Sequence, residues 1–222
     1  SRNKNLADEL NAFPYVNGGL FEEFIEMPSF TQEMRDVLIE CCLFNWKDIS
    51  PAIFGSLFQS IMDKETRRNL GAHYTSEQNI LKLIEPLFLD DLKAQFKAIE
   101  KLKQVNKRAQ KFIELMQQLQ SLKFLDPACG CGNFLIITYR ELRKLELKIL
   151  QAQQKDAGQL HIGIEIEPQI KLNNFYGIEI DEWPARIAEV AMWLTHQQVN
   201  VEFAKAFGTE PDLLPLIQHA NM

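Results

Sequence analysis

Apolar residues recur at helical spacing through the first third of the chain. Thr31 fits an N-cap, and the residues after it predict a helix that ends near Leu43. Its inward face is expected to carry Met34, Val37, Leu38 and Cys41. Ser50-Pro51 predicts the start of another helix. Its apolar face is expected to carry Ile53, Phe54, Leu57, Phe58 and Ile61. Because no strand pattern occurs, residues 1–70 are predicted to form a helical spacer region that packs on a neighbour.

The segment Gly71 to Ser76 interrupts this pattern, and helical spacing then resumes at about Glu77. The inward face of this helix is expected to carry Ile80, Leu81, Ile84 and Leu87. A single long amphipathic helix is predicted next, from about Leu92 to Leu119. Its apolar stripe consists of Leu92, Phe96, Ile99, Leu102, Val105, Ala109, Phe112, Met116 and Leu119.

The pattern then changes to short apolar runs separated by turns. A buried strand is predicted at 124–127, and Gly130-Cys131-Gly132 predicts a tight turn. Asn133 is expected to cap an apolar helix that carries Phe134, Leu135, Ile137, Leu142 and Leu145. A second strand is predicted at 174–180.

A further helix is expected to start at Asp181 or Glu182, with Pro184 in its first turn. Its inward residues are expected to be Ile187, Val190, Ala191 and Leu194. A third strand is predicted at 217–222. This order is the opening of a doubly wound sheet, so residues 71–222 predict an α/β fold with a partial Rossmann-like sheet.

Composition is that of an ordinary globular protein, with 46% hydrophobic and 24% charged residues among 222. No apolar run approaches the roughly 20 residues that cross a bilayer, and the N-terminus lacks a signal-peptide core. The four cysteines form neither a disulfide framework nor a paired zinc spacing. A reduced, cytoplasmic setting without a structural metal or a membrane partner is therefore expected.

Charge is spread unevenly along the chain. The net charge is −6, which argues against strong nucleic-acid binding by this chain as a whole. Between Lys93 and Lys123, however, eight basic residues stand against two acids. This stretch could face DNA, although a solvated helix face is the commoner explanation.

The glycine turn 126–133 is the strongest candidate for a ligand site. In open α/β sheets, ligands bind beyond the carboxyl ends of the strands, beside the first glycine-rich turn. A dinucleotide site requires a third glycine where this sequence has Leu135. Asp126 at the strand end would repel a pyrophosphate, whereas it suits a ligand with an amine and a sulfonium. The residues therefore favour S-adenosylmethionine over NAD.

An acid at the end of the second strand can accept hydrogen bonds from ribose hydroxyls. Glu179 fits this role, and Ile180 beside it could pack on the adenine ring. Glu165, in the similar segment 163–167, is a competitor. Glu179 is preferred because its strand runs directly into the amphipathic helix that a crossover needs.

These residues resemble the motifs of γ-type amino-methyltransferases, which methylate exocyclic amines of DNA. Gly71–Thr75 matches motif X, Asp126–Gly132 matches motif I, and Glu179 matches motif II, in the γ order. The departures are Ser76 for a proline and Cys131 for a serine. The chain is similar in particular to MmeI-type enzymes, in which a nuclease, a helical spacer, a methyltransferase and a target-recognition domain share one polypeptide. The segments that carry this similarity are 13–21, 70–76 and 183–194.

The resemblance implies a role for each matching residue. Tyr74 and Thr75 would bind the methionine end of S-adenosylmethionine, Glu179 its ribose, and Asn221 the adenine amino group. The cradle around the cofactor would consist of Asp126, Pro127, Ala128, Gly130, Gly132, Asn133, Phe134 and Ile180. Residues 71–222 would be the N-terminal portion of the methyltransferase domain.

The family's catalytic Asn-Pro-Pro-Tyr or Asn-Pro-Pro-Phe does not occur in the sequence, so no catalytic residue is assigned. No metal-dependent nuclease motif is recognised either. The resemblance implies a DNA adenine-N6 methyltransferase of a restriction-modification system. Its partner would be double-stranded DNA, with the nuclease and recognition domains outside these residues. The alternatives are a methyltransferase acting on RNA or protein glutamine, a nicotinamide or flavin oxidoreductase, and a non-catalytic cofactor-binding module.

Overall fold

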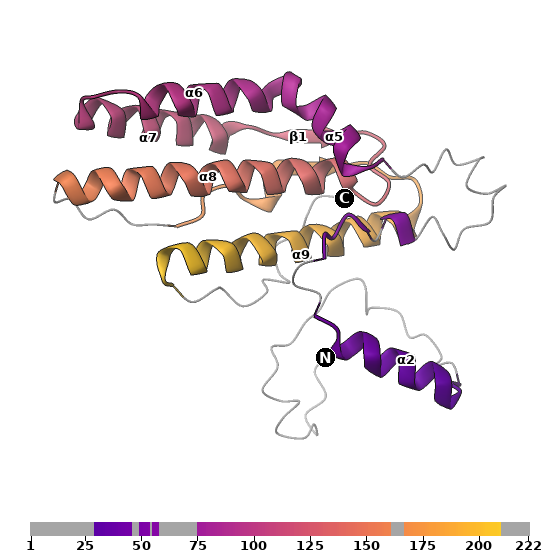
Figure 1. The fold of residues 1–222 in the computed structure, drawn as a ribbon. Helices are drawn as coiled ribbons and strands as arrows, with labels where there is room; N and C mark the ends of the chain where they lie inside the picture. Colours follow the sequence, from indigo (N-terminus) through magenta and orange to yellow (C-terminus); the bar gives the residue numbers. More distant parts are fainter. Residues whose placement is uncertain (1–28, 46–48, 54, 58–74, 161–166, 210–222) are drawn as a thin grey trace, which may run out of the picture.

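The computed structural model of the chain describes residues 29–45, 49–53, 55–57, 75–160 and 167–209. The described part is mostly helical, with one pair of strands (Figure 1). The helices are α2 (Gln32–Leu43), α5 (Glu77–Ile84), α6 (Asp90–Glu100), α7 (Val105–Ser121), α8 (Asn133–Leu160) and α9 (Glu182–Phe207). The strands are β1 (Phe124–Asp126) and β2 (Phe175–Gly177).

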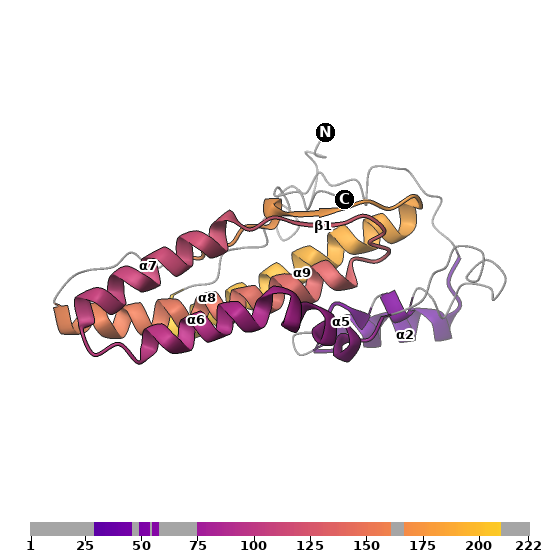
Figure 2. The ribbon, with the colours of Figure 1, turned by 90° about the horizontal axis from the view of Figure 1, so that it is seen from above.

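The two strands are parallel and α8 forms the crossover between them, which is the predicted βαβ order. Phe124 pairs with Phe175 in the register, and their rings stack at 5.1 Å. The ring of Tyr139 in α8 packs edge-on against the ring of Phe175, with ring centres 5.1 Å apart. Aromatic packing therefore covers this face of the strands. On the opposite face Leu125 is 62% exposed, and no described helix covers it (Figure 2). The wider Rossmann-like sheet stays a prediction, since strand 217–222 lies outside the described residues.

The centre of the molecule is α8, which lies between the α6–α7 hairpin and α9 (Figure 1). Of the residues predicted to face inward on α9, Ala191 is fully buried, whereas Ile187, Val190 and Leu194 are only half-buried. The prediction missed that α9 is buried on several sides. Its buried residues also include Ala188, Met192, Thr195, Val199 and Phe203.

A buried polar network joins α8 to α9 within this core. Arg143 donates to Tyr139 Oη at 2.7 Å and to Asn200 Oδ1 at 3.0 Å. His196 contacts Tyr139 at 2.6 Å and Asn200 at 3.0 Å through its two ring nitrogens. Glu146 pairs with Arg143 at 2.6 Å and accepts the backbone N–H groups of residues 169 and 170. The network therefore fixes both helices and the approach to β2, because each buried charge has a partner.

The single helix predicted over 92–119 is wrong. The chain instead reverses at 101–104, and α6 and α7 form an antiparallel hairpin (Figures 1 and 2). The apolar stripe folds back on itself, so that Phe96 packs against Phe112 with ring centres 5.7 Å apart. Arg108 stabilises the reversal by donating to Leu102 O at 2.7 Å and by pairing with Asp156 of α8.

Between α5 and α6 the helix widens into a π-helical segment, Glu85–Leu89. Its closing bond runs from Asp90 N to Glu85 O, one residue further than in an α-helix. The extra residue rotates the face, so Leu87, predicted to be inward, is 71% exposed and Leu89 is fully buried.

Helix α2 has the predicted bounds and cap, since Thr31 Oγ1 accepts from Met34 N at 3.2 Å. Its expected inward face is nevertheless exposed, and no residue of α2 is buried among the described residues. The predicted start at Ser50 is a turn, closed by Ile53 N to Ser50 O at 3.0 Å. Residue 53 and residues 55–57 are helical.

Candidate cofactor site

The turn after β1 has the backbone that its glycines predict. Gly130 and Gly132 have positive φ angles of 54° and 78°. A Cβ on Gly132 would lie 2.9 Å from Ala188 Cβ, so this glycine also permits close packing of the turn on α9. A Cβ on Gly130 would meet nothing within 4 Å among the described residues. The space beside Gly130 is therefore open to a ligand.

Two acids from the ends of the parallel strands meet at this turn. Asp126 Oδ1 accepts from Ala128 N at 3.1 Å. Glu179 Oε2 accepts from Gly130 N at 2.8 Å, and its Oε1 accepts from the backbone N–H groups of residues 180 and 181. The structure thus brings together Asp126, Gly130 and Glu179, which the sequence predicted as one site. Glu165, the competing acid, lies outside the described residues.

The site is electrostatically negative. No described basic residue forms an ion pair with Asp126 or Glu179. Burial, together with the charges of Asp126 and Glu179, raises the pKa of the Cys129 thiol to about 12. Burial and the charge of Glu179 raise the pKa of Cys131 to about 11. Both thiols are therefore uncharged at neutral pH, and the negative charge at the edge of the strands comes from the two carboxylates.

Asn133 was expected to cap the next helix, but α8 begins at Asn133 itself. Gly132 takes the cap position, and its carbonyl accepts from Ile136 N at 2.9 Å. The Asn133 side chain instead lies against Gly55, where an added Cβ would be 3.0 Å from Asn133 Nδ2. Its Oδ1 is buried and accepts no hydrogen bond from a described residue. An unused buried acceptor beside the turn is consistent with a ligand donor.

Segment 49–57, part of the predicted spacer, therefore packs on the site. Ala52 is 3% exposed, and Gln198 of α9 donates to Ile49 O at 2.9 Å. Nothing in the sequence before the turn indicated this contact. The predicted boundary at residue 70 stays a prediction, and the contact shows that residues on both sides of it build the same surface.

The remaining predicted residues lie around the rim. Pro127 and Ala128 are exposed, and Phe134 is half-buried in the first turn of α8. Ile180 is 93% exposed, and its contact with a ligand ring stays a prediction. Trp183 is 64% exposed nearby in the sequence, and the sequence interpretation had given it no role at the site.

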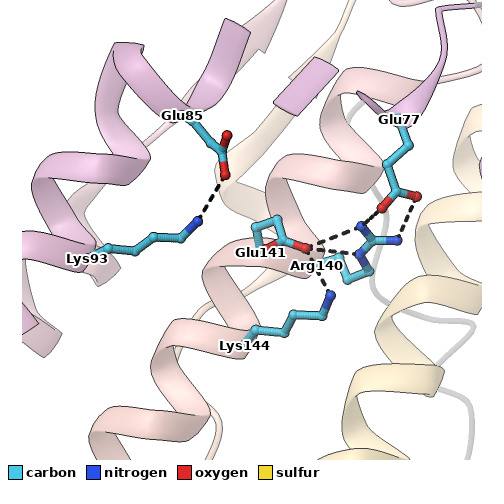
Figure 3. Close-up of polar contacts among 6 residues, drawn as sticks. All are labelled: Glu77, Glu85, Lys93, Arg140, Glu141 and Lys144. Carbon is cyan, nitrogen blue, oxygen red and sulfur yellow. Dashed lines mark hydrogen bonds and ion pairs between the residues drawn. The ribbon is translucent and has the colours of Figure 1, made fainter. Parts of the chain in front are cut away.

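The predicted methionine-binding segment is described only from Thr75, which is half-buried; Tyr74 and Asn221 lie outside the described residues. Two residues after Thr75, Glu77 receives two hydrogen bonds from Arg140 of α8, one of them at 3.1 Å (Figure 3). Glu141 and Lys144 complete this cluster, with Lys144 Nζ 2.9 Å from Glu141. The hydrogen bonds from Arg140 hold the pKa of Glu77 below its ordinary value. The pair thus ties the start of α5 to the helix that begins at the glycine turn.

Within the described ranges, no cluster of side chains has the composition of a metal site. The same ranges contain no helix of the length and apolarity that a membrane span requires.

Known proteins match most of this chain. The family model of the MmeI DNA-methyltransferase domain matches residues 102–222. A DNA methyltransferase A of Bacillus subtilis is 42% identical over 205 residues, which are 90% of this chain and 22% of the relative. A putative type II restriction enzyme and methyltransferase of Methanocaldococcus jannaschii is 27% identical over 93% of this chain and 20% of its own length.

A solved structure shows the same fold. The type IIL restriction-modification enzyme MmeI, in complex with DNA, superposes with a TM-score of 0.82 and is 51% identical. The match covers 98% of this chain and 28% of that enzyme, so the chain spans between a fifth and a third of the length of these relatives. The resemblance found in the sequence motifs is confirmed: the chain belongs to the MmeI DNA-methyltransferase domain family.

Proposed function

We propose that this chain binds S-adenosylmethionine at the edge formed by Asp126, Gly130 and Glu179. It would do so as part of a DNA methyltransferase of a restriction-modification enzyme that modifies adenine at N6. The observation that carries this proposal is the meeting of two carboxylates from parallel strands beside an open glycine, with no described basic residue to neutralise them. A pyrophosphate would be repelled there, whereas a sulfonium and an ammonium would be attracted.

The residues present fit this cofactor. Among the described residues, only Gly130 N donates to Glu179 Oε2, so this oxygen retains a lone pair for a ribose hydroxyl. Asn133 Oδ1 is a buried acceptor without a described donor, and Ile180 offers an exposed apolar surface to an adenine ring. Thr75 stands at the start of a helix held on α8, as expected for the methionine end.

In this proposal each residue of the chain binds or orients, and none transfers a proton. When bound, S-adenosylmethionine supplies an electrophilic methyl group. Asp126 would face the amine and sulfonium of the cofactor and Glu179 its ribose, and the glycine turn would let the cofactor approach the backbone. Positioning of this kind accounts for much of the rate gain in group transfer between two bound reactants. Target bases that enzymes modify are flipped out of the duplex, and we propose the same for the adenine.

The residues that would hold the methyl-accepting amine are not assigned to this chain, because its sequence has no Asn-Pro dipeptide. We propose that the 222 residues bind the cofactor and transfer no methyl group on their own. The partial Rossmann-like sheet belongs to the same proposal, with further strands extending the parallel pair.

Titration calorimetry with S-adenosylmethionine and NAD tests the cofactor. The S-adenosyl compound is expected to bind, and NAD is not. Asp126→Asn and Glu179→Gln should each weaken binding about tenfold to a hundredfold, since a hydrogen bond to a charged group contributes roughly 1.5–3 kcal/mol. Glu202→Gln, an exposed acid on α9, is the matched control and should bind as the wild type does.

Binding of NAD without S-adenosylmethionine would overturn the proposal, as would equal losses in Glu202→Gln and Glu179→Gln. The base is tested with the protein as its gene encodes it. Duplex DNA is methylated with a labelled donor and digested to nucleosides, in which N6-methyladenine is expected. Methylated cytosine instead would refute the adenine assignment.

A further inference from the structure

A groove of about 610 Å³ lies between α6 and α8, away from the glycine turn. The two helices run side by side in both ribbon views (Figures 1 and 2). Phe96 and Leu145, both buried, are the apolar residues of its floor. Four lysines line its rims: Lys93, Lys97, Lys148 and Lys155. We call this cavity the lysine groove.

The lysine groove is strongly positive in a chain whose net charge is −6. Glu100 is the one acid among the residues that line it. Lys93 is paired with Glu85 at 3.3 Å (Figure 3). Lys97, Lys148 and Lys155 are exposed and form no ion pair with a described residue. Like charges gathered in this way repel one another, so an anion between them would relieve the repulsion.

The groove is separate from the proposed cofactor site. Both sites involve α8, which begins at Asn133 beside the turn and contributes residues 145–155 to the groove. At 1.5 Å per residue these residues lie about 18–33 Å further along the helix. A ligand of the groove therefore cannot be the cofactor, and it need not be the base that is modified.

The chemistry of the groove favours a chain of phosphates over a single small anion. Its cations are all lysines, which act as point charges, and no arginine fork for bidentate recognition is among the residues that line it. Phe96 is only 8% exposed, so it offers no open face on which a base could stack. From Lys148 to Lys155 the rim spans about 10 Å, a length over which one DNA strand carries roughly three phosphates.

We propose that the lysine groove binds the phosphate backbone of duplex DNA outside the base pairs at which methylation occurs. This inference rests on the proposed function in one respect, that the substrate is duplex DNA. The contact supplies affinity and orientation and reads no sequence, as phosphate contacts by lysine generally do.

The test is a salt titration of duplex binding, followed by fluorescence anisotropy, with the protein as its gene encodes it. The groove variant is Lys97→Gln/Lys148→Gln/Lys155→Gln. Its matched control, Lys107→Gln/Lys171→Gln/Lys205→Gln, removes the same charge from exposed lysines elsewhere. Each phosphate contact contributes about 0.9 to the slope of log affinity against log salt, so the groove variant should lose about 2–3 of that slope. Its affinity at about 0.1 M salt should fall on the order of tenfold or more.

Three further measurements sharpen the result. A duplex extended by several helical turns should lose more affinity in the groove variant than a short one does. Glu100→Gln, which removes the groove's acid, should strengthen binding to the extended duplex. Lysine acetylation of the wild-type protein, read by mass spectrometry, should show DNA protecting Lys97, Lys148 and Lys155. This measurement needs no variant to fold.

The proposal is overturned if the groove variant and the control lose equal affinity or none. It is also overturned if acetylation of the groove lysines is unaffected by DNA, or is already blocked without DNA because another protein segment covers them. Failure of the proposed function gives a different signature: S-adenosylmethionine then does not bind, whatever the groove lysines do. The groove variant itself should titrate with S-adenosylmethionine as the wild type does.

Discussion

Arg140 in α8 donates two parallel hydrogen bonds to Glu77 in the first turn of α5 (Figure 3). Arg140 is two helical turns beyond the glycine turn, and Glu77 is two residues beyond Thr75. The pair therefore joins two segments that are far apart in sequence and that are both proposed to hold the same cofactor. A bidentate pair of this kind fixes orientation as well as distance.

Replacing Arg140 by Met should weaken cofactor binding more than it lowers stability. Because Glu77 is 39% exposed, its pairing with Arg140 is expected to contribute only about 1 kcal/mol to cofactor binding. The affinity for S-adenosylmethionine should therefore fall roughly fivefold. The measurement is titration calorimetry beside a denaturant melt. The exchanged double variant Glu77→Arg/Arg140→Glu should recover most of the affinity. No recovery, with unchanged stability, would argue against a positioning role.

The same pair predicts a pH dependence of stability. Arg140 lowers the pKa of Glu77 below its ordinary value of about 4.5. A depressed carboxyl pKa contributes stability that is fully present above the ordinary pKa and is lost as the pH falls through the folded value. The difference in unfolding free energy between wild type and Glu77→Gln should thus be constant at roughly neutral pH, about 6 to 8. It should shrink as the pH falls below about 4.5. A gap that grows on acidification would contradict this account.

The two glycines of the turn should respond differently to alanine. Gly132→Ala combines a positive φ with a Cβ only 2.9 Å from Ala188 Cβ, so it should cost about 2–4 kcal/mol of stability. Gly130→Ala meets only the backbone penalty, about 1 kcal/mol, because the space beside it is open. It should nevertheless impair cofactor binding, since its methyl group would enter that space. Chemical denaturation and calorimetry on both variants separate the two effects, and equal destabilisation would contradict the geometry.

The buried Arg143–Glu146 pair should be far more sensitive to losing one partner than to losing both. Both side chains are at most 2% exposed. Glu146→Leu leaves the Arg143 charge unpaired and should cost about 3–5 kcal/mol. In Arg143→Met/Glu146→Leu the unpaired charge is absent, and the cost should be smaller despite the second substitution. Thermal and denaturant unfolding measure both, with Lys111→Met/Glu114→Leu as the exposed i,i+3 control.

The cysteines should differ in reactivity. Cys129 and Cys131, with pKa values raised to about 12 and about 11, are protonated thiols at pH 8. Cys41 and Cys42 lie exposed on α2. Iodoacetamide at pH 8 should label the α2 pair first, as read by peptide mass spectrometry. In Glu179→Gln the Cys131 thiol should react faster, because a charge that raises its pKa is gone. Unchanged labelling would show that burial alone protects it.

The sequence was most informative where local chemistry and topology agree. The strand ending at Asp126, its glycine turn and the following helix depend on neighbouring residues only, and the structure has all three. The choice of Glu179 followed from the helix that immediately continues its strand, and Glu179 indeed meets the turn. In both cases the prediction required no knowledge of distant contacts.

It was least informative where distant parts of the chain decide the outcome. The reversal at 101–104 has neither glycine nor proline, and the apolar spacing continues through it. What makes it a turn is packing of Phe96 on Phe112 and the bond from Arg108 to Asp156, which lies on a later helix. Gly55 was missed for the same reason, since its importance comes from Asn133.

Gly132 lies so close to Ala188 that the shape of the turn depends on this alanine of α9, which is not one of the proposed cofactor-binding residues. A side chain larger than alanine at 188 would have to displace α9 or the backbone between the strand and α8. The size of the side chain at position 188 thus sets the distance between α9 and the glycine turn. Variation there would alter which molecules the turn admits before any residue of the turn itself had changed.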